Sequence, residues 1–423
     1  MVSKNRRKIL AVLGSSLFVA GCTNSSSDSP DTSTSQQPPT ATSTVRTTKP
    51  SEQNETQRTT EVSNTPKSEF NKHLKTTGHW PQFQFDATKT GHSDDVNGVS
   101  SDGSVYWKRA KGGEPIINGN RIYTIERHEG QLFLLTRKIQ TGEIAHKYRI
   151  SNGTWTALSN NNVLYSSSSS LVSVNTRDWT ENWKFDLSVR NIYAPAIDHS
   201  VIYISAEPLG FDDTKGVVKA IDANTGKTYW KNTVSETKEV ALQRGQALYY
   251  IDSGNLIAVE PKNGDMKWKY TQSSSIDTYP VAAGQFVLYG NQDSITCLHA
   301  SNGQKVWSQQ IESCNGIAVS DNVAFISDNG GISATDLVDG QQIWRANIGT
   351  AMIPSVDAET VYVDADSQLF ALNRSTGEKH WSYEFPDVVI EGDVLASGTR
   401  SPPTIIDDGI LVQAVDGLYA FGQ

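Results

Sequence analysis

The sequence predicts an all-β protein, a β-propeller of eight four-stranded antiparallel blades. One phrase of apolar, turn and aromatic residues returns along the chain with a period of about 39 residues. Each unit has room for two more short strands ahead of that phrase. The chain also ends three strands into a unit, and the strand that would complete this unit stands near the start of the repeats, around Trp107.

The repeated phrase predicts a strand, a tight turn and a second strand. The turn is rich in Asp, Asn and Gly, which supply local hydrogen bonds and positive φ angles. Tryptophan follows the turn glycine by four residues in Gly103/Trp107, Gly226/Trp230, Gly264/Trp268, Gly303/Trp307, Gly340/Trp344 and Gly377/Trp381. Two further copies are degenerate, because Gly142 is followed by His146 and Trp183 is preceded by Trp179 instead of glycine.

Aliphatic and small residues mark one face of the strand before each turn. Two-residue spacing places both kinds on the same side of a strand, and a small side chain indicates a close approach of neighbouring sheets. The aliphatic residues are Leu134, Leu171, Val218, Leu256, Ile295, Ile332 and Leu369. The small ones are Thr136, Ser173, Ala220, Ala258, Cys297, Ala334 and Ala371. The two earlier strands of a unit are expected in pairs such as Ala194–Asp198 with Val201–Ser205, or Ile353–Val356 with Thr360–Val363.

Ring closure decides the number of blades. Thr404–Ile406, Ile410–Gln413 and Leu418–Phe421 supply three strands of a last blade, whereas residues 103–107 have no strand of their own to pair with. Joining the two ends removes the exposed edges of an open ring. The count is then eight, with seven as the alternative if the weak second unit is not a blade.

The N-terminal residues have the features of an export signal, which we assign to residues 1–21. Four basic residues precede the apolar run Ile9–Ala20, which is too short to cross a bilayer because a spanning helix takes about 20 residues. The run ends in Val19-Ala20-Gly21-Cys22, which resembles a lipobox, so Cys22 is the predicted lipidation site. The pair Arg6-Arg7 leaves twin-arginine export open beside the general secretory route.

Residues 22–75 are predicted to be a disordered stalk, followed by the propeller at 76–423. The stalk consists mainly of Ser, Thr, Pro, Gln and scattered charges and therefore cannot bury a core. Asn24 and Asn54 stand in Asn-x-Ser/Thr sequons. The whole chain has a formal net charge of −9 and no basic cluster outside the leader, which argues against a nucleic-acid partner.

The repeated phrase and the opening Trp80–Gly91 resemble the pyrroloquinoline-quinone-type propeller repeat. That repeat occurs in quinoprotein alcohol dehydrogenases and in a lipoprotein of bacterial outer-membrane assembly, and the resemblance covers about Trp80 to Gln423. It implies that the repeat tryptophans and glycines dock one blade onto the next instead of binding a cofactor. These residues are Trp107, Trp183, Trp230, Trp268, Trp307, Trp344 and Trp381, with Gly103, Gly142, Gly226, Gly264, Gly303, Gly340 and Gly377.

Catalytic motifs are absent from the sequence. Quinoprotein dehydrogenases resemble one another in an adjacent cysteine pair and often a haem attachment motif, whereas the cysteines here are Cys22, Cys297 and Cys314. Cys297 occupies the small-residue position of its repeat and is expected in the core, with a Cys297–Cys314 disulfide as an open alternative. The histidines show no zinc-binding spacing. We therefore expect no catalytic residue, no metal and no cofactor, with pyrroloquinoline quinone as the alternative.

The expected function is binding, by a scaffold anchored at the outer face of the cytoplasmic membrane with a protein, peptide or glycan as its partner. The alternative is a quinone-dependent oxidoreductase. Two long insertions, Ala206–Gly216 and Phe385–Pro402, join strands at the same end of the propeller and lie four blades apart. They should therefore face each other across the mouth of the central channel. The predicted partner face comprises Phe211, Asp387, Val389, Glu391 and Arg400.

Overall fold

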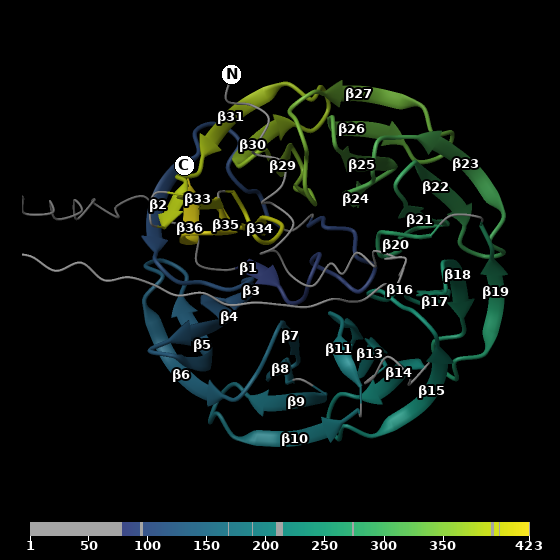
Figure 1. The fold of residues 1–423 in the computed structure, drawn as a ribbon, viewed down its shortest axis with the longest axis horizontal. Coiled ribbons are helices and arrows are strands. Elements are labelled where there is room, and N and C mark those ends of the chain that lie inside the picture. Colours follow the sequence, from purple (N-terminus) through teal and green to yellow (C-terminus); the bar gives the residue numbers. More distant parts are fainter. Residues whose placement is uncertain are drawn as a thin grey trace, which may run out of the picture. The chain divides into compact units, whose positions relative to one another are not determined.

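Eight antiparallel sheets radiate from a central axis in the computed structural model (Figure 1). The structure describes residues 78–422 except 94–95, 168, 188, 209–214, 273–274, 391–392 and 397. The predicted eight-bladed all-β architecture is confirmed, and the alternative of seven blades is wrong. The predicted leader, the lipidation site Cys22 and the stalk lie outside the described residues.

Within blades 1 to 7 the first of the four strands in sequence lies toward the axis and the last lies on the rim, whereas the rim strand of blade 8 comes from the N-terminal side of the chain (Figure 1). Blades 1 to 4 consist of β3 (Ile116–Gly119), β4 (Arg121–His128), β5 (Gln131–Lys138), β6 (Ile144–Ile150); β7 (Thr156–Ser159), β8 (Asn162–Ser167), β9 (Ser170–Asn175), β10 (Glu181–Asp186); β12 (Ala196–Asp198), β13 (Val201–Glu207), β14 (Gly216–Asp222), β15 (Thr228–Val234); and β16 (Ala241–Gln243), β17 (Ala247–Asp252), β18 (Asn255–Val259), β19 (Met266–Tyr270).

The other half of the ring repeats this arrangement. Blades 5 to 8 consist of β20 (Val281–Ala283), β21 (Phe286–Gly290), β22 (Ser294–His299), β23 (Lys305–Gln310); β24 (Gly316–Ser320), β25 (Val323–Asp328), β26 (Gly331–Asp336), β27 (Gln342–Ala346); β28 (Ser355–Val356), β29 (Thr360–Ala365), β30 (Gln368–Asn373), β31 (Lys379–Glu384); and β34 (Thr404–Ile406), β35 (Gly409–Ala414), β36 (Gly417–Gly422), β2 (Ser104–Arg109).

Blade 8 is closed by β2 from the N-terminal side of the chain, as predicted. β2 pairs antiparallel with β36, and Trp107 lies opposite Ala420. The sheet order β2-β36-β35-β34 therefore joins the two ends of the chain in one blade. Because the ring is complete, β34 and β2 take the same inner and outer positions as the first and last strands of the other blades.

The small residue of each repeat has a specific structural reason, since it is the cross-strand partner of the repeat tryptophan. Ala220 lies opposite Trp230, and the same pairing recurs at Ala258/Trp268, Cys297/Trp307, Ala334/Trp344 and Ala371/Trp381. In each of these pairs the register shifts immediately after the small residue, as at a β-bulge. The small side chain thus leaves room for the indole on the same sheet.

Each tryptophan also lies against the glycine of the following blade. A Cβ atom on Gly264 would stand 2.7 Å from the Trp230 ring, so a larger residue could not fit unless the indole moved. The same contact occurs between Trp381 and Gly103 across the closure. The indole Nε1 donates a hydrogen bond to a carbonyl of the next turn, for example Trp230 to Pro261 at 2.8 Å and Trp381 to Val99 at 2.8 Å. Glycine, indole and carbonyl therefore form one repeated contact between blades.

Between blades 1 and 2 this contact has its indole at the other position: the tryptophan stands where the other blades have glycine. Trp179 takes the glycine position with φ +60 and stacks on His146, which takes the tryptophan position of blade 1, at a centroid distance of 4.2 Å. The aromatic bulk has thus moved from one blade to the next, and the interface between blades 1 and 2 keeps one indole.

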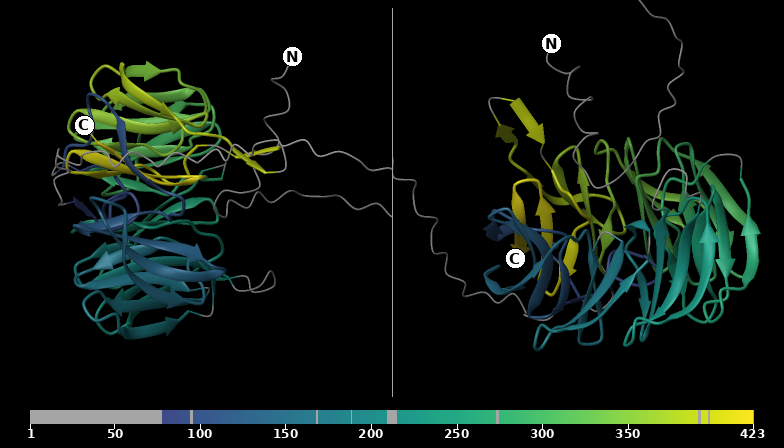
Figure 2. Two further views of the ribbon diagram at one scale, coloured as in Figure 1. Left: turned by 90° about the vertical axis from the view of Figure 1, so that its left-hand side faces the viewer. Right: turned by 60° about the horizontal axis from the view of Figure 1, so that its bottom comes forward.

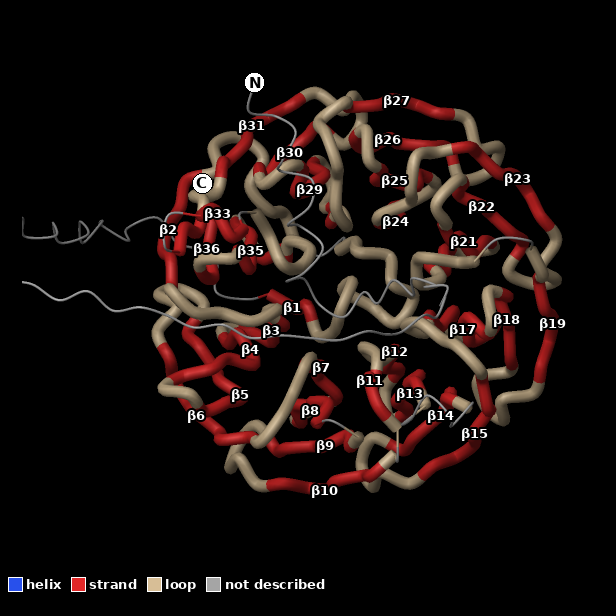
Figure 3. Tube along the Cα trace, in the orientation of Figure 1, coloured by secondary structure: helices blue, strands red, loops and turns tan. Residues whose placement is uncertain are grey.

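The inner strands begin later than the sequence pattern indicates. The expected strand Ala194–Asp198 begins at Ala196, and Ile353–Val356 begins at Ser355. Pro195 and Pro354 have no N–H to donate to a ladder, and each directly precedes the observed start. Figure 3 shows strands and loops throughout the described chain, and within it no helix has the length and apolarity of a membrane span.

Candidate functional site

The channel of the propeller is crossed by residues 78–99, which we call the central strap. The strap begins as β1 (Gly78–Trp80), which pairs with β3, and then passes the inner strands of the other blades in chain order (Figure 1). Inner strands turn one edge toward the channel, and the N–H groups on that edge need acceptors. The strap carbonyls and the Gln82 side chain supply such acceptors.

Blades 2 to 8 each donate at least one hydrogen bond to the strap. The bonds are Leu158 N to Pro81 O at 2.7 Å, Ile197 N to Gln82 Oε1 at 3.0 Å, Leu242 N to Ala87 O at 2.7 Å, Ala282 N to Thr88 O at 2.9 Å, Val319 N to Thr90 O at 2.8 Å, Val356 N to Gly91 O at 2.9 Å and Asp408 N to Asn97 O at 2.8 Å. The strap is therefore a second connection between blades beside the rim contacts, and its last residue, Val99, also accepts the indole hydrogen bond of Trp381.

Lys89 of the strap is a fully buried cation. Its side chain is 0% exposed, and Nζ donates to Pro195 O at 2.6 Å and to Phe83 O at 3.3 Å. Burial lowers the pKa of Lys89 to about 8, against the opposing effects of the charges of Glu239, Asp86 and Glu114. Lys89 thus ties the strap to blade 3 through a backbone carbonyl.

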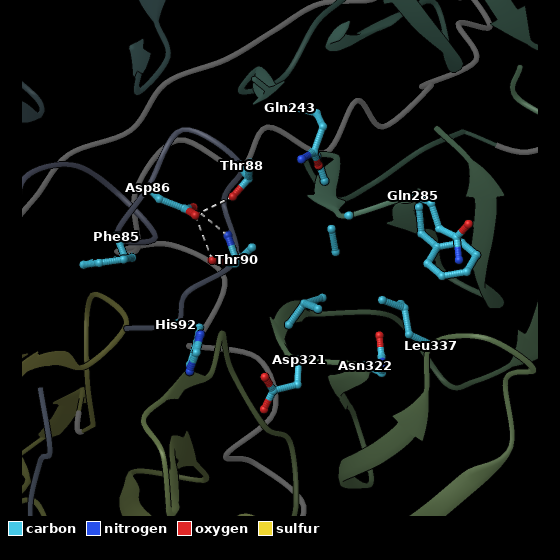
Figure 4. A pocket seen from close by; sticks show the side chains of 15 residues that line it. Phe85, Asp86, Thr88, Thr90, His92, Gln243, Gln285, Asp321, Asn322 and Leu337 are labelled. Atoms are coloured by element: carbon cyan, nitrogen blue, oxygen red, sulfur yellow. Dashed lines mark hydrogen bonds between the residues drawn. The ribbon is translucent and has the colours of Figure 1, made fainter. Parts of the chain in front are cut away.

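A cavity of about 650 Å³ opens where the strap meets blades 4 to 6 (Figure 4). It lies on the turn face, which we define as the end of the propeller where the first and second strands of each blade connect. Asp86, Thr90 and His92 of the strap form one side, and Asp321 and Asn322 of the β24–β25 turn form another. The lining is therefore mainly polar.

The polar groups of this cavity are largely held by the protein itself. Asp86 accepts hydrogen bonds from the hydroxyl of Thr88 and from the backbone N of Thr90 at 3.0 Å (Figure 4). Burial raises the pKa of Asp86, and these hydrogen bonds oppose the shift. Asp321 forms an ion pair with Arg374. In the described part of the chain, no three His, Cys, Asp or Glu side chains come together in a group that could hold a metal ion.

The opposite end is the loop face, where the outer strand of each blade connects to the inner strand of the next. One separate two-stranded sheet and one additional strand of blade 3 lie on this face. β32 (Val388–Ile390) and β33 (Asp393–Ala396) form a hairpin between blades 7 and 8 that projects beyond the blades in Figure 2. In blade 3, β11 (Arg190–Ile192) pairs with the end of β13, and Asn191 Nδ2 donates to Glu207 Oε2 at 2.7 Å.

The structure places only part of the predicted partner face. Phe211 and Glu391 lie outside the described residues. Asp387 and Arg400 are exposed on either side of the hairpin, and Val389 belongs to β32, where it pairs with Val394. Two of the five predicted residues thus have described, solvent-exposed side chains.

Both cysteines of the propeller are buried free thiols, so the alternative of a disulfide between them is not realised. Burial raises the pKa of Cys297 and of Cys314 to about 12, so neither is a reactive thiolate. Cys297 faces Trp307 in the small-residue position.

Sequence reasoning missed the route of the strap, the cavity beside it and the polar groups in the channel. The one available signal was the cluster of Asp86, Thr88 and Thr90 directly before Gly91, which is typical of a side-chain-capped turn. Nothing in that local pattern indicates that the turn lies in a channel.

Comparison with known proteins assigns the family. Residues 94–346 and 328–421 match the family model described as outer membrane protein assembly factor BamB. Outer membrane protein assembly factor BamB of Yersinia pestis is 25% identical over 300 residues, covering 56% of this chain and 76% of the relative. The Escherichia coli K12 protein of that description is 23% identical over 337 residues, covering 54% of this chain and 84% of the relative.

Solved structures share the fold at low identity. BamB from Moraxella catarrhalis has a TM-score of 0.60 at 12% identity and covers 76% of this chain and 100% of that one. Quinohemoprotein alcohol dehydrogenase from Comamonas testosteroni has a TM-score of 0.65 at 12% identity, with coverage of 84% and 82%. The fold is thus shared with an assembly factor and with an alcohol dehydrogenase, whereas the sequence matches reported above are to the assembly factor. The chain belongs to the family described as outer membrane protein assembly factor BamB.

Proposed function

We propose that the protein is a non-enzymatic scaffold of the cell envelope that binds a protein partner through its loop face. A lipid on Cys22 holds it at the outer face of the cytoplasmic membrane. We infer the partner face from two strand pairings on the loop face: hairpin β32–β33, and strand β11 with the end of β13. The relatives' description as assembly factors of outer membrane proteins supports a protein partner over a glycan or a small molecule.

Hairpin β32–β33 has the physical features of a docking element. It is a sheet of two strands that pair only with each other among the described strands. An isolated two-stranded hairpin is only marginally stable in water, and its free edges can accept a further strand from another chain. Val388, Ile390 and Leu395 supply apolar residues in the hairpin, and Asp387 and Arg400 flank it with charge. A partner with an extended apolar segment fits this combination.

Shortening both extensions is expected to abolish partner binding and leave the fold intact. The variant replaces residues 388–396 and 208–215 by short Gly-Ser linkers, and cross-linking in the native cells measures the partner. Val338→Ser, at an exposed position of the turn face, is the matched control and should retain the cross-links. Undiminished cross-linking of the shortened protein would place the partner on the turn face or the rim.

Anchoring through Cys22 is tested by Cys22→Ser. A serine hydroxyl cannot take the thioether-linked diacylglyceryl group, so the variant should be either unprocessed or released from the membrane. Fractionation with an immunoblot for size distinguishes these outcomes from the native protein. A mature-sized Cys22→Ser protein that still sediments with membranes contradicts lipidation at this residue.

A further inference from the structure

Three side-chain carboxamides from three successive blades line the cavity beside the strap. Gln243 ends β16, whereas Gln285 and Asn322 are the second residues of the turns between β20 and β21 and between β24 and β25. They lie on the sides of the cavity away from the strap (Figure 4). The cavity volume of about 650 Å³ lies within the range of small-molecule sites, about 300–1,000 Å³. The blades thus supply one chemical group three times around a cavity of ligand size.

These carboxamides have no partner within the described structure. The Oε1 atom of Gln243 is buried without a hydrogen-bond partner among the described residues. The side chains of Gln285 and Asn322 are exposed and form no hydrogen bond in the part of the chain that the structure describes. A buried carbonyl oxygen normally accepts a hydrogen bond, because leaving it unpaired is costly. A ligand with a hydroxyl group in the cavity would supply the missing donor.

The charged groups of the lining disfavour an ionic ligand. Asp86 accepts hydrogen bonds within the strap and Asp321 pairs with Arg374, so neither carboxylate needs a cation. No lysine or arginine is among the described residues that line the cavity. The remaining basic group, His92, has its Nε2 atom 2.9 Å from the hydroxyl of Ser320. The ligand that fits this lining is therefore polar and neutral.

An extended peptide would bind by adding a strand to the inner edges of blades 4 to 6, but the strap already lies there. The N–H groups of Leu242, Ala282 and Val319 donate to strap carbonyls. These groups are not available to a second strand, and main-chain hydrogen bonds give strand addition its affinity. A ligand of this cavity is therefore recognised by side chains.

We propose that this cavity binds a sugar residue of a neutral saccharide through Gln243, Gln285 and Asn322. Each carboxamide has an acceptor oxygen and two N–H donors, and each sugar hydroxyl can donate and accept, so the two groups are complementary. Ala283 and Val319 give the lining an apolar part against which the C–H groups of a pyranose ring can pack. The site lies on the turn face, so its test is independent of the partner site proposed on the loop face.

Calorimetric titration of the full-length protein with maltose, cellobiose and N,N′-diacetylchitobiose tests the site. At least one of these neutral disaccharides should bind saturably with a Kd below about 1 mM. Absence of saturable binding of all three up to about 20 mM overturns the proposal. If the uncharged peptide acetyl-Thr-Gly-Thr amide binds and the disaccharides do not, the cavity takes a peptide and the proposal is wrong.

Three leucine variants test whether the disaccharide lies in this cavity. Gln243→Leu should weaken binding at least about tenfold because its oxygen is buried, and Gln285→Leu and Asn322→Leu should weaken it severalfold. Gln341→Leu, at an exposed position outside the cavity between β26 and β27, is the matched control and should bind as the native protein does. Unchanged affinity in the variants of Gln285 and Asn322 overturns the site even if Gln243→Leu fails to fold.

A resin that carries the bound disaccharide separates the two sources of the sugar. Coupling through the reducing end leaves the other sugar unit exposed, as at the end of a glycan chain. If the resin retains the protein and the free disaccharide elutes it, the site takes the terminal unit of a glycan. If the protein passes through the resin and still binds the disaccharide in solution, the site takes a free sugar.

Discussion

A chain that starts at Gly112 is expected to lose the cooperative unfolding of the complete ring. It lacks β2, so β36 becomes an open edge and blade 8 has three strands. It also lacks Trp107, whose ring lies against Gly142 of the next blade and whose Nε1 donates to Ile139 O at 2.9 Å. Calorimetry should show a broad or split transition at lower temperature than for residues 76–423. An unchanged single transition contradicts closure by β2.

Trp107→Ala isolates the closing contact within the full ring. Loss of a buried tryptophan side chain costs about 3–5 kcal/mol, and Trp107 is 5% exposed. Val105→Ala is the matched control on the same strand, because Val105 is 37% exposed and should lose well under about 1 kcal/mol. Denaturant unfolding of the two variants gives the difference. Equal losses would show that the indole has no special part in closure.

The repeated features of this fold could be predicted from the sequence because each copy forms the same strand, turn and strand with the same contact to the next blade. The turn glycine, the tryptophan four residues later and the small residue six positions before the glycine recur, so an error in one copy is corrected by the others. Closure by β2 followed from counting strands at the two ends. The predicted starts of the inner strands were less accurate. The apolar pattern does not take into account that Pro195 and Pro354 have no N–H to donate to a neighbouring strand.

The channel could not be predicted in this way because its contacts occur once. Lys89 of the strap donates to the carbonyl of Pro195, and the strap carbonyls of Ala87 and Thr88 accept from Leu242 and Ala282. These partners are more than one hundred residues away, and no side-chain pattern reveals such backbone contacts. The stacking of Trp179 on His146 could not be predicted for the same reason. The two side chains belong to different blades, and their contact depends on how these blades pack in the ring.

The strap is expected to contribute several kcal/mol to the ring without being needed for its closure. A chain starting at Ser100 keeps β2 and Trp107 but loses the acceptors for Leu158, Ala282 and Val319. Each such hydrogen bond is worth about 0.5–1.5 kcal/mol net, and removal of the strap also exposes apolar surface of the inner strands. The inward N–H groups can then bind water, so the ring should survive in a less stable form.

Calorimetry distinguishes the strap from the closing strand. Residues 100–423 should unfold in a single transition that is lower by about 10 °C or more than that of residues 78–423, whereas the chain from Gly112 should lose the single transition. The difference arises because the strap adds one or two bonds per blade around the whole ring, while β2 supplies one complete strand at one blade. If residues 100–423 unfold at the same temperature as residues 78–423, the strap fills the channel without stabilising it.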